Sequence, residues 1–300
     1  MTSLKSKYFI KKFLRNIRNT RYNLLVDTNK EPRVLLRGYE IHFELKITSD
    51  KTKNGQRQQE VSMTGQKYDR CWIYSENLIY QWTKAVKTVL EIFKFRRHSV
   101  LFYIDKFPTQ NKSIVDFMKS LTPSIESCEF HGKAETDDDV EYFLKNLKVT
   151  EFVRFNLKLS DNFMFPQYHY LECLSIDPGN WVTLDQLLRF HGSEIFIHDS
   201  PLTNYELNQF LILWMTSQCH QNLSFLLINI NDPQSLETIF NLPHEMINPN
   251  VERIGRLANN DTISLRGDID IKRNDGMTGT IRFDWRLDKM ILKMVVSWID

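Results

Sequence analysis

Six short runs of alternating large apolar residues recur along the chain from about residue 99 onward. In each run, two large apolar residues or a cysteine flank one variable position, which is the pattern of a β-strand with one buried face. The pairs are Phe102/Ile104, Cys128/Phe130, Phe155/Leu157, Leu174/Ile176, Ile195/Ile197 and Leu226/Ile228. The first members of successive pairs are 26, 27, 19, 21 and 31 residues apart. Leucine-rich repeats have periods of about 20–29 residues.

One of these runs matches the leucine-rich-repeat strand consensus at all four of its positions, which are Leu223, Leu226, Ile228 and Asn231. Signals for helix starts lie between the strands, because a side chain that can cap a helix precedes an apolar segment of helical period. These signals are Ser113, Thr136 with Asp139, Thr183 with Gln186, Thr203 with Glu206, and Asp232 before Pro233. Repeated strand–helix units with short connections imply parallel strands with right-handed crossovers.

The predicted fold class is therefore α/β, as a leucine-rich-repeat-like strand–helix solenoid with a parallel sheet. Each unit has too little apolar surface to fold alone, so stacking of the units supplies the core. The alternative is an ordinary open α/β sheet, because the period of the repeat is irregular.

The two ends of the chain depart from this repeat. Before it, Asn23–Val26, Val34–Leu36 and the alternating residues of 41–47 predict strands, and the polar segment 48–59 predicts a mobile loop. A long amphipathic helix is expected over 78–93. After residue 260, a hairpin and a third strand predict an antiparallel cap on the last repeat. The three cap strands are Ile269–Lys272, Thr278–Asp284 and Ile291–Trp298.

Residues 1–20 are basic and contain no acidic residue, and Ile10, Phe13, Leu14 and Ile17 form one apolar face of a helix. This pattern fits a helix that docks on the rest of the protein. It also fits a mitochondrial presequence, a contact with membrane or nucleic acid, or a solvated tail.

Composition and charge narrow the classes of function. The apolar fraction is 42%, the charged fraction 25% and the net charge +2, which is normal for a globular protein and gives no general attraction to polyanions. The four cysteines contain no CxxC pair, so we interpret them as small buried apolar residues. No run of 18 apolar residues and no secretory signal occurs. We predict neither a nucleic-acid nor a membrane partner.

No residue cluster specifies a chemical reaction. The nucleotide-binding, zinc-protease and hydrolase motifs GxGxxG, GxxxxGK[ST], HExxH and GxSxG do not occur. We interpret Asp137–Asp139 as the first turn of a helix, where negative charge is favourable. Cys219 and His220 are adjacent and would point about 100° apart on a helix, and His191 with His198 would need further ligands to hold a metal. We therefore predict no catalytic, metal or cofactor site and no enzyme.

The variable positions of the strand runs should face the open side of the parallel sheet. These residues are Tyr103, Glu129, His131, Arg154, Asn156, Lys158, Ser175, Asp177, Glu194, Phe196, His198, Leu227 and Asn229. Polar groups mixed with exposed aromatic rings are typical of protein-binding faces. A solvated sheet without a ligand is the alternative interpretation.

Several short segments resemble, in the same order, a known family. They are Ser160-Asp161-Asn162-Phe163, Trp181-Val182-Thr183-Leu184 with Leu187-Leu188, Leu202-Thr203-Asn204 through Leu207-Asn208-Gln209-Phe210-Leu211 to Trp214-Met215, and Asp270-Ile271-Lys272-Arg273 with Asp275-Gly276 and Thr280-Ile281. The chain resembles nematode F-box proteins that carry the type 2 F-box-associated domain.

The resemblance implies a non-catalytic subunit that recruits a protein substrate to a Skp–cullin–F-box ubiquitin ligase. Residues 3–13 resemble only the tail of an F-box, so docking on a Skp-type adaptor is left open. The implied organisation is an F-box remnant over 1–20, an N-terminal strand region over 21–70, and an F-box-associated repeat domain over 71–300 with its cap over 260–300. The expected compartment is the cytoplasm, with the nucleus as the alternative. The alternative function is an α/β enzyme that uses an open-sheet crevice.

Overall fold

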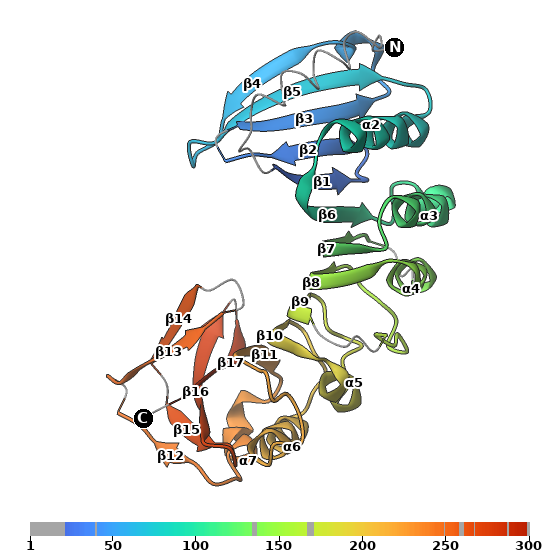
Figure 1. The fold of residues 1–300 in the computed structure, drawn as a ribbon. Coiled ribbons are helices and arrows are strands. Elements are labelled where there is room, and N and C mark those ends of the chain that lie inside the picture. The colour runs from blue at the N-terminus through green and yellow to red at the C-terminus, as the bar shows by residue number, and fades with distance from the viewer. Residues whose placement is uncertain are drawn as a thin grey trace. The chain divides into compact units, whose positions relative to one another are not determined.

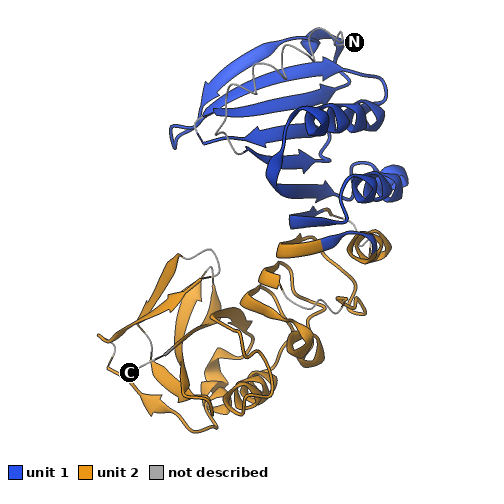
Figure 2. Cartoon of the chain, viewed as in Figure 1, with its two compact units in different colours: residues 1–131, 146–148 blue, residues 132–145, 149–300 orange. Residues whose placement is uncertain are grey.

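The computed structural model describes residues 22–39, 41–133, 137–166, 171–248, 250–257, 261–266, 268–286 and 288–298 (Figure 1). The helix expected over 1–20 lies outside these residues. The chain divides into two compact units, residues 1–131 with 146–148, and residues 132–145 with 149–300 (Figure 2). Strands that carry the first two apolar runs therefore belong to the same unit as the N-terminal strands.

The first unit is a mixed sheet with helices on one side (Figure 1). Its elements are β1 (Tyr22–Asp27), β2 (Arg33–Arg37), β3 (Ile41–Thr48), the 3-10 turn η1 (Lys51–Lys53), β4 (Arg57–Val61), β5 (Lys67–Tyr74), α2 (Leu78–Ile92), β6 (Phe95–Tyr103), η2 (Pro108–Gln110), α3 (Asn111–Leu121) and β7 (Ser124–His131). The strand order is β7-β6-β1-β2-β3-β5-β4. The β1–β6, β6–β7 and β3–β5 pairs are parallel, and the other pairs are antiparallel.

Helix α2 forms where the 3.6-residue period predicted it. Asn77 caps its first turn by accepting a hydrogen bond from the Tyr80 amide, and the apolar face buries Trp82, Val86 and Val89 against the sheet. The Trp82 indole also donates a hydrogen bond to the Arg33 carbonyl, at 3.2 Å. The helix therefore covers the N-terminal strands through one large aromatic side chain whose polar group is satisfied.

The strand predicted over 41–47 is present as β3, but two details of this unit differ from the sequence pattern. In β3 the polar alternate residues His42 and Glu44 are buried, whereas Ile41 is exposed and Phe43 half-buried. Ion pairs from Arg33 and Arg70 allow the Glu44 carboxylate to be buried, because a charge leaves water only when it is paired. The segment 48–59 contains η1 and the start of β4 rather than loop alone. Its turn is closed by the Asp50 carboxylate, which accepts from the Thr52 amide.

The second unit contains the remaining strands and helices, with α4, α5 and α6 on one side of the parallel strands (Figure 1). Its elements are α4 (Asp137–Asn146), β8 (Lys148–Asn156), β9 (Leu171–Ile176), α5 (Leu184–Arg189), β10 (Gly192–Ile197), α6 (Asn204–Met215), β11 (Phe225–Ile230), η3 (Pro233–Ser235), α7 (Leu236–Ile239), β12 (Glu245–Met246), β13 (Glu252–Arg256), β14 (Thr262–Arg266), β15 (Ile269–Lys272), β16 (Met277–Arg286) and β17 (Lys289–Trp298). Its main sheet has the order β12-β15-β16-β17-β11-β10-β9-β8.

The six apolar runs all fall on strands or directly after them. The β6–β7 pair of the first unit is parallel, and so are the β8–β9, β9–β10 and β10–β11 pairs of the second. Phe155 lies opposite Ile176 rather than Leu174, so its run is offset by one pair, but the same face remains buried. The α/β prediction and the parallel strands are confirmed. The solenoid and the leucine-rich-repeat likeness stay predictions.

The helix starts follow the predicted caps at three places, one of which is Asp232, which caps η3 before Pro233 by accepting a hydrogen bond from the Gln234 amide. Thr183 accepts a hydrogen bond from the Gln186 amide before α5, and Thr203 and Glu206 form a complete capping box before α6. The prediction at Ser113 is wrong, because α3 begins at Asn111 and the Ser113 hydroxyl donates to the Gln110 carbonyl inside its first turn. Thr136 lies outside the described residues.

The C-terminal strands β15, β16 and β17 form the predicted antiparallel meander. However, β17 pairs edge to edge with β11 and extends the sheet. A separate two-stranded ribbon, β13–β14, which the sequence did not predict, packs on this part of the sheet. A side-chain carbon at Gly255 would come within 2.5 Å of Val295, so glycine permits the close approach of the ribbon.

Candidate partner-binding face

The predicted open-face residues of β8 to β11 form rows across the second unit. Arg154 lies opposite Ser175, Ser175 opposite Phe196, and Phe196 opposite Leu227. Because the helices lie on the other side of these strands and side chains alternate along a strand, this row points to the side without helices. The register thus brings together four residues that the sequence separates by up to 73 positions.

The ribbon β13–β14 covers one end of this row. Leu265 of β14 packs in an apolar cluster with Phe225, Leu227, Ile291 and Val295, and Phe196 packs at its margin. Leu227 is consequently buried, and Glu194, which lies opposite Phe225, is buried as well. These two predicted partner-binding residues are not open to a partner in this conformation, whereas Arg154, Asn156 and Lys158 at the other end are exposed.

A cleft of about 300 Å³ lies at the carboxyl ends of β9, β10 and β11. It is lined by Asp177, His198, Asp199, Asn229, Arg286, Lys289 and Ile291. Asp177, His198 and Asn229 were in the predicted set, and the structure brings them together here. Sequence reasoning missed Arg286 and Lys289, because they flank the β16–β17 turn about 60 residues downstream of Asn229 and no local pattern ties them to the repeat.

Side-chain amides hold the turn beside this cleft, and one of them, Asn229, is buried. Asn229 accepts a hydrogen bond from the Ser200 amide at 2.7 Å and donates to the Ser200 carbonyl at 3.2 Å. Asn231, the last consensus position of its strand run, donates to the carbonyls of Ser200 and Leu202. Asn229 is therefore a positioning residue that holds the turn after β10, and not a residue that a partner would contact.

The remaining predicted face residues, Tyr103, Glu129 and His131, lie on β6 and β7 of the first unit. The rings of Tyr103 and His131 stack with their centroids 4.6 Å apart, and a His131 nitrogen lies 3.7 Å from a Glu129 oxygen. Burial raises the pKa of the Tyr103 hydroxyl, and the negative charge of Asp27 raises it further. These three residues form a compact polar cluster of the first unit.

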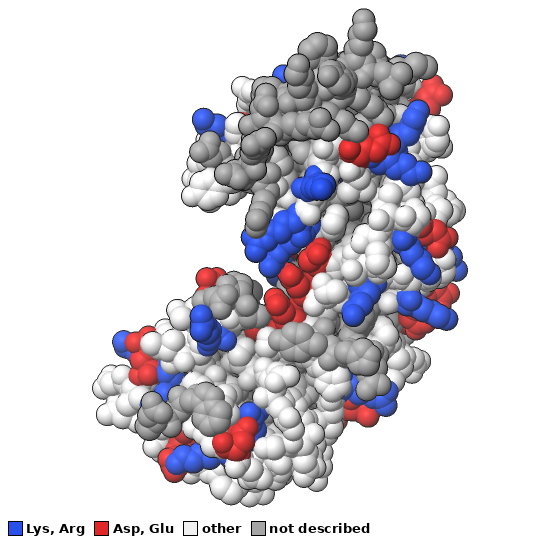
Figure 3. All heavy atoms as spheres, viewed as in Figure 1, with Lys and Arg blue, Asp and Glu red and all other residues white. Residues whose placement is uncertain are grey.

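Charge on the drawn face is mixed. In Figure 3, Lys and Arg side chains lie beside Asp and Glu side chains, in keeping with a net charge of +2. A nucleic-acid-binding surface is marked by a stripe or patch of one positive sign. The drawn face therefore does not favour nucleic acid as the partner.

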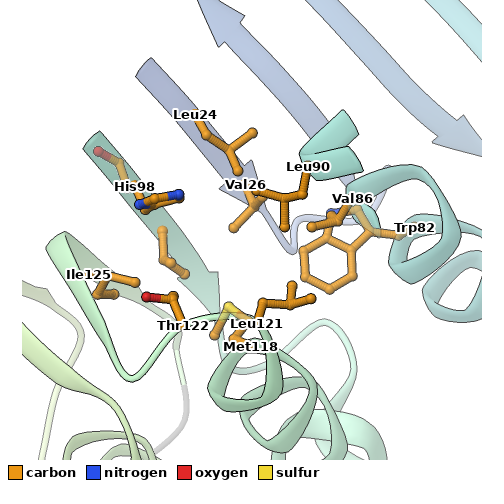
Figure 4. Close-up of a pocket in the computed structure, with 12 residues that line it drawn as sticks. Leu24, Val26, Trp82, Val86, Leu90, His98, Met118, Leu121, Thr122 and Ile125 are labelled. Carbon is orange, nitrogen blue, oxygen red and sulfur yellow. The ribbon is translucent and has the colours of Figure 1, made fainter. Parts of the chain in front are cut away.

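The first unit also contains a small apolar cavity of about 40 Å³ between β1, α2 and α3 (Figure 4). Leu24 and Val26 of β1, Trp82 of α2 and Met118 of α3 line it. An apolar space of this size holds little more than a water-sized group and has few polar partners to offer. We interpret it as a packing gap in the core.

The two residue pairs considered for chemistry do not form reactive sites in the structure. His191 and His198 line clefts at opposite ends of β10. Burial raises the pKa of the Cys219 thiol to about 11, so the thiol stays protonated at neutral pH and is a poor nucleophile. The described residues contain no group of three or more His, Cys, Asp or Glu that could hold a metal ion.

Strand order bears on the alternative of an enzyme with an open-sheet crevice. Strands β8 to β11 of the second unit follow chain order without a reversal. In the first unit the order reverses at β1, which lies between β2 and β6. Ligands of α/β sheets bind at such a reversal, but here the turn after β1 occupies it, since Thr28 bonds to the backbone of Leu101 and Tyr103.

Acidification is expected to destabilise the second unit through His220. This side chain packs on Phe210. Burial, with a smaller contribution from the charge of His191, lowers its pKa from 6.5 to about 4. The unfolded chain therefore binds a proton more readily, so stability present above pH 6.5 is lost as the pH falls toward 4, by about 3 kcal/mol. Urea unfolding at pH 7 and pH 4.5 measures the loss.

The matched control for this prediction is the exposed His244. The His220→Leu variant should lose less stability than the wild type between the two pH values, and His244→Leu should lose as much as the wild type. Equal losses in His220→Leu and the wild type would contradict the assignment.

Comparison with known proteins gives one match, to a family model. Residues 162–228 match the model of a family described as F-box associated. The matched segment contains β9, β10 and most of β11, and with them Ser175, Asp177 and Phe196. No curated protein and no solved structure matches the chain. No described helix is both long and apolar enough to cross a membrane.

Proposed function

We propose that the chain is a non-catalytic receptor, which recruits a protein to a Skp–cullin–F-box ubiquitin ligase in the cytoplasm or nucleus. The premise is that residues 162–228 form an F-box-associated domain. The family match carries this proposal, because it supplies the recognition role that the geometry alone does not specify. The nematode origin suggested by the sequence stays a prediction.

The open side of β8, β9 and β10 is the part of the second unit that best fits this role. Its row of Arg154, Ser175 and Phe196 combines a guanidinium, a hydroxyl and an aromatic ring. Arg154 also lies over the Phe152 ring, 5.2 Å from its centroid, which is an amphipathic arrangement common in protein interfaces. Helices cover the other side of these strands, so this side is the one available for contact.

Co-purification from cells with mass spectrometry tests the proposal. The full chain, tagged at its C-terminus, is expected to recover a Skp-type adaptor together with further proteins. The Arg154→Glu/Lys158→Glu variant should lose some of the further proteins and keep the adaptor, because it reverses two charges on the open side.

The matched control reverses charge on the helix side of the same unit. Arg189 on α5 forms an exposed pair with Asp185, so Arg189→Glu should recover the same proteins as the wild type. Recovery of other proteins without any adaptor would refute the ligase part alone. Identical recovery by Arg154→Glu/Lys158→Glu and the wild type would refute the assignment of the face.

A further inference from the structure

We propose that the cleft at the carboxyl ends of β9, β10 and β11 binds a mixed-charge segment of the partner protein, in which an acidic and a basic side chain lie close together. Asp177 would contact the basic group and Arg286 the acidic group. This inference rests on the proposed receptor function and names the chemistry that one part of the receptor recognises.

The cleft is built from distant parts of the second unit. Asp177 directly follows β9, His198 and Asp199 follow β10, and Arg286 and Lys289 lie opposite each other at the ends of β16 and β17. The volume of about 300 Å³ lies at the small end of the range for ligand sites and fits one or two side chains.

Four charged side chains line this cleft, and only two of them form an ion pair with each other. Lys289 forms an ion pair with Asp199. Within the described parts of the chain, neither the Asp177 carboxylate nor the Arg286 guanidinium forms an ion pair or a side-chain hydrogen bond, and both residues are exposed. Two opposite charges thus line one cleft without meeting each other. A segment that carries both signs can pair with both at once.

Charge complementarity decides against an occupant of one sign. A purely acidic segment would pair with Arg286 but would meet the carboxylate of Asp177, and a purely basic segment would meet Arg286. Like charges placed together at an interface are penalised. A mixed-charge segment avoids both penalties, and its two ion pairs replace water that the exposed groups hold in the free protein.

The groups of the cleft are held in place before binding. Asn229 and Asn231 fix the turn after β10. Gly179 lies so close to β10 that a side-chain carbon would come within 2.9 Å of the His198 carbonyl, which holds the segment after Asp177 against that strand. Positions fixed in advance reduce the ordering cost of binding.

Binding of the purified full chain to short synthetic peptides tests the inference. The peptides carry Glu and Lys at varied spacings, Glu alone, Lys alone, or neither, on one neutral background. We expect the mixed-charge peptides to bind about fivefold more tightly than the single-sign peptides, because they form one further exposed ion pair, which contributes up to about one kcal/mol. Asp177→Lys and Arg286→Glu should each remove this preference.

Arg189→Glu is the matched control and should keep the preference of the wild type. Equal binding of mixed-charge and single-sign peptides, or equal effects of Arg286→Glu and Arg189→Glu, would overturn the inference. The inference would also be overturned if a mixture of free lysine and free glutamate, at the same concentration as the peptide, abolished the preference. That result would indicate a small-molecule site. The co-purification experiment tests the receptor function independently. The receptor function can therefore hold even if the peptides show no charge preference.

Discussion

Replacing Trp181 by alanine is expected to lower the free energy of unfolding of the second unit by about 3–5 kcal/mol. The Trp181 side chain is 1% exposed and packs edge-on against Phe155, Phe163 and Phe190, with centroid distances of 5.8, 4.9 and 6.2 Å. Truncation removes these contacts and leaves a cavity that three rings on separate elements cannot fill. Urea unfolding followed by hydrogen exchange over residues 171–198 measures the loss.

The same substitution should loosen one wall of the charged cleft, because Trp181 lies four residues after Asp177. Trp285→Ala is the matched control, since Trp285 is 65% exposed and its loss should change stability by no more than about 0.5 kcal/mol. A loss below 1 kcal/mol in Trp181→Ala, on the scale of a surface change, would show that the aromatic cluster does not hold the unit together.

Replacing Glu44 by alanine is expected to destabilise the first unit by about 3–5 kcal/mol. Glu44 is 2% exposed and accepts hydrogen bonds from Arg33, at 2.7 Å, and from Arg70. Its removal leaves the two guanidinium groups facing each other across β2, β3 and β5 without the carboxylate between them. Hydrogen exchange over residues 33–48 in urea measures the change.

The pH dependence of this contribution has a definite sign. Burial acts to raise the pKa of Glu44, but the hydrogen bonds from Arg33 and Arg70 outweigh it and lower the pKa below 4.5. The contribution is therefore present above pH 4.5 and is lost as the pH falls below that value. Glu60→Ala is the control, because Glu60 is 54% exposed and 3.4 Å from Arg70, and should cost less than about 1 kcal/mol. Equal losses in the two variants would contradict the role of Glu44.

Local pattern was a reliable guide to helix α2 and to the starts of α5 and α6. The period of α2 and the cap residues Thr183 and Thr203 predicted helices that the structure contains. The pattern failed in β3, where ion pairs contributed by residues 11 positions before and 26 positions after Glu44 make its polar face the buried one. A sequence window cannot detect such a reversal, because the partners belong to other strands.

The sequence predicted the candidate site only in part. Alternation correctly assigned Arg154, Ser175 and Phe196 to one side of the parallel strands. It could not indicate that β13–β14 covers Leu227, because a two-stranded ribbon leaves only a weak signal and its packing depends on the surface it meets. Nor could it place Arg286 in the same cleft as Asp177, since this placement depends on β17 pairing with β11.

By itself, then, the sequence determined the α/β class, the strand runs, most helix starts and the side of the strands that is free of helices. These features depend on the period of apolar residues and on caps, which act over a few positions. Only the tertiary structure decided which parts of that side stay open, which buried charges are paired, and which opposite charges share a cleft. Such features depend on pairings between distant strands. The free energy of those pairings depends on residues from several segments at once, so no single segment determines it.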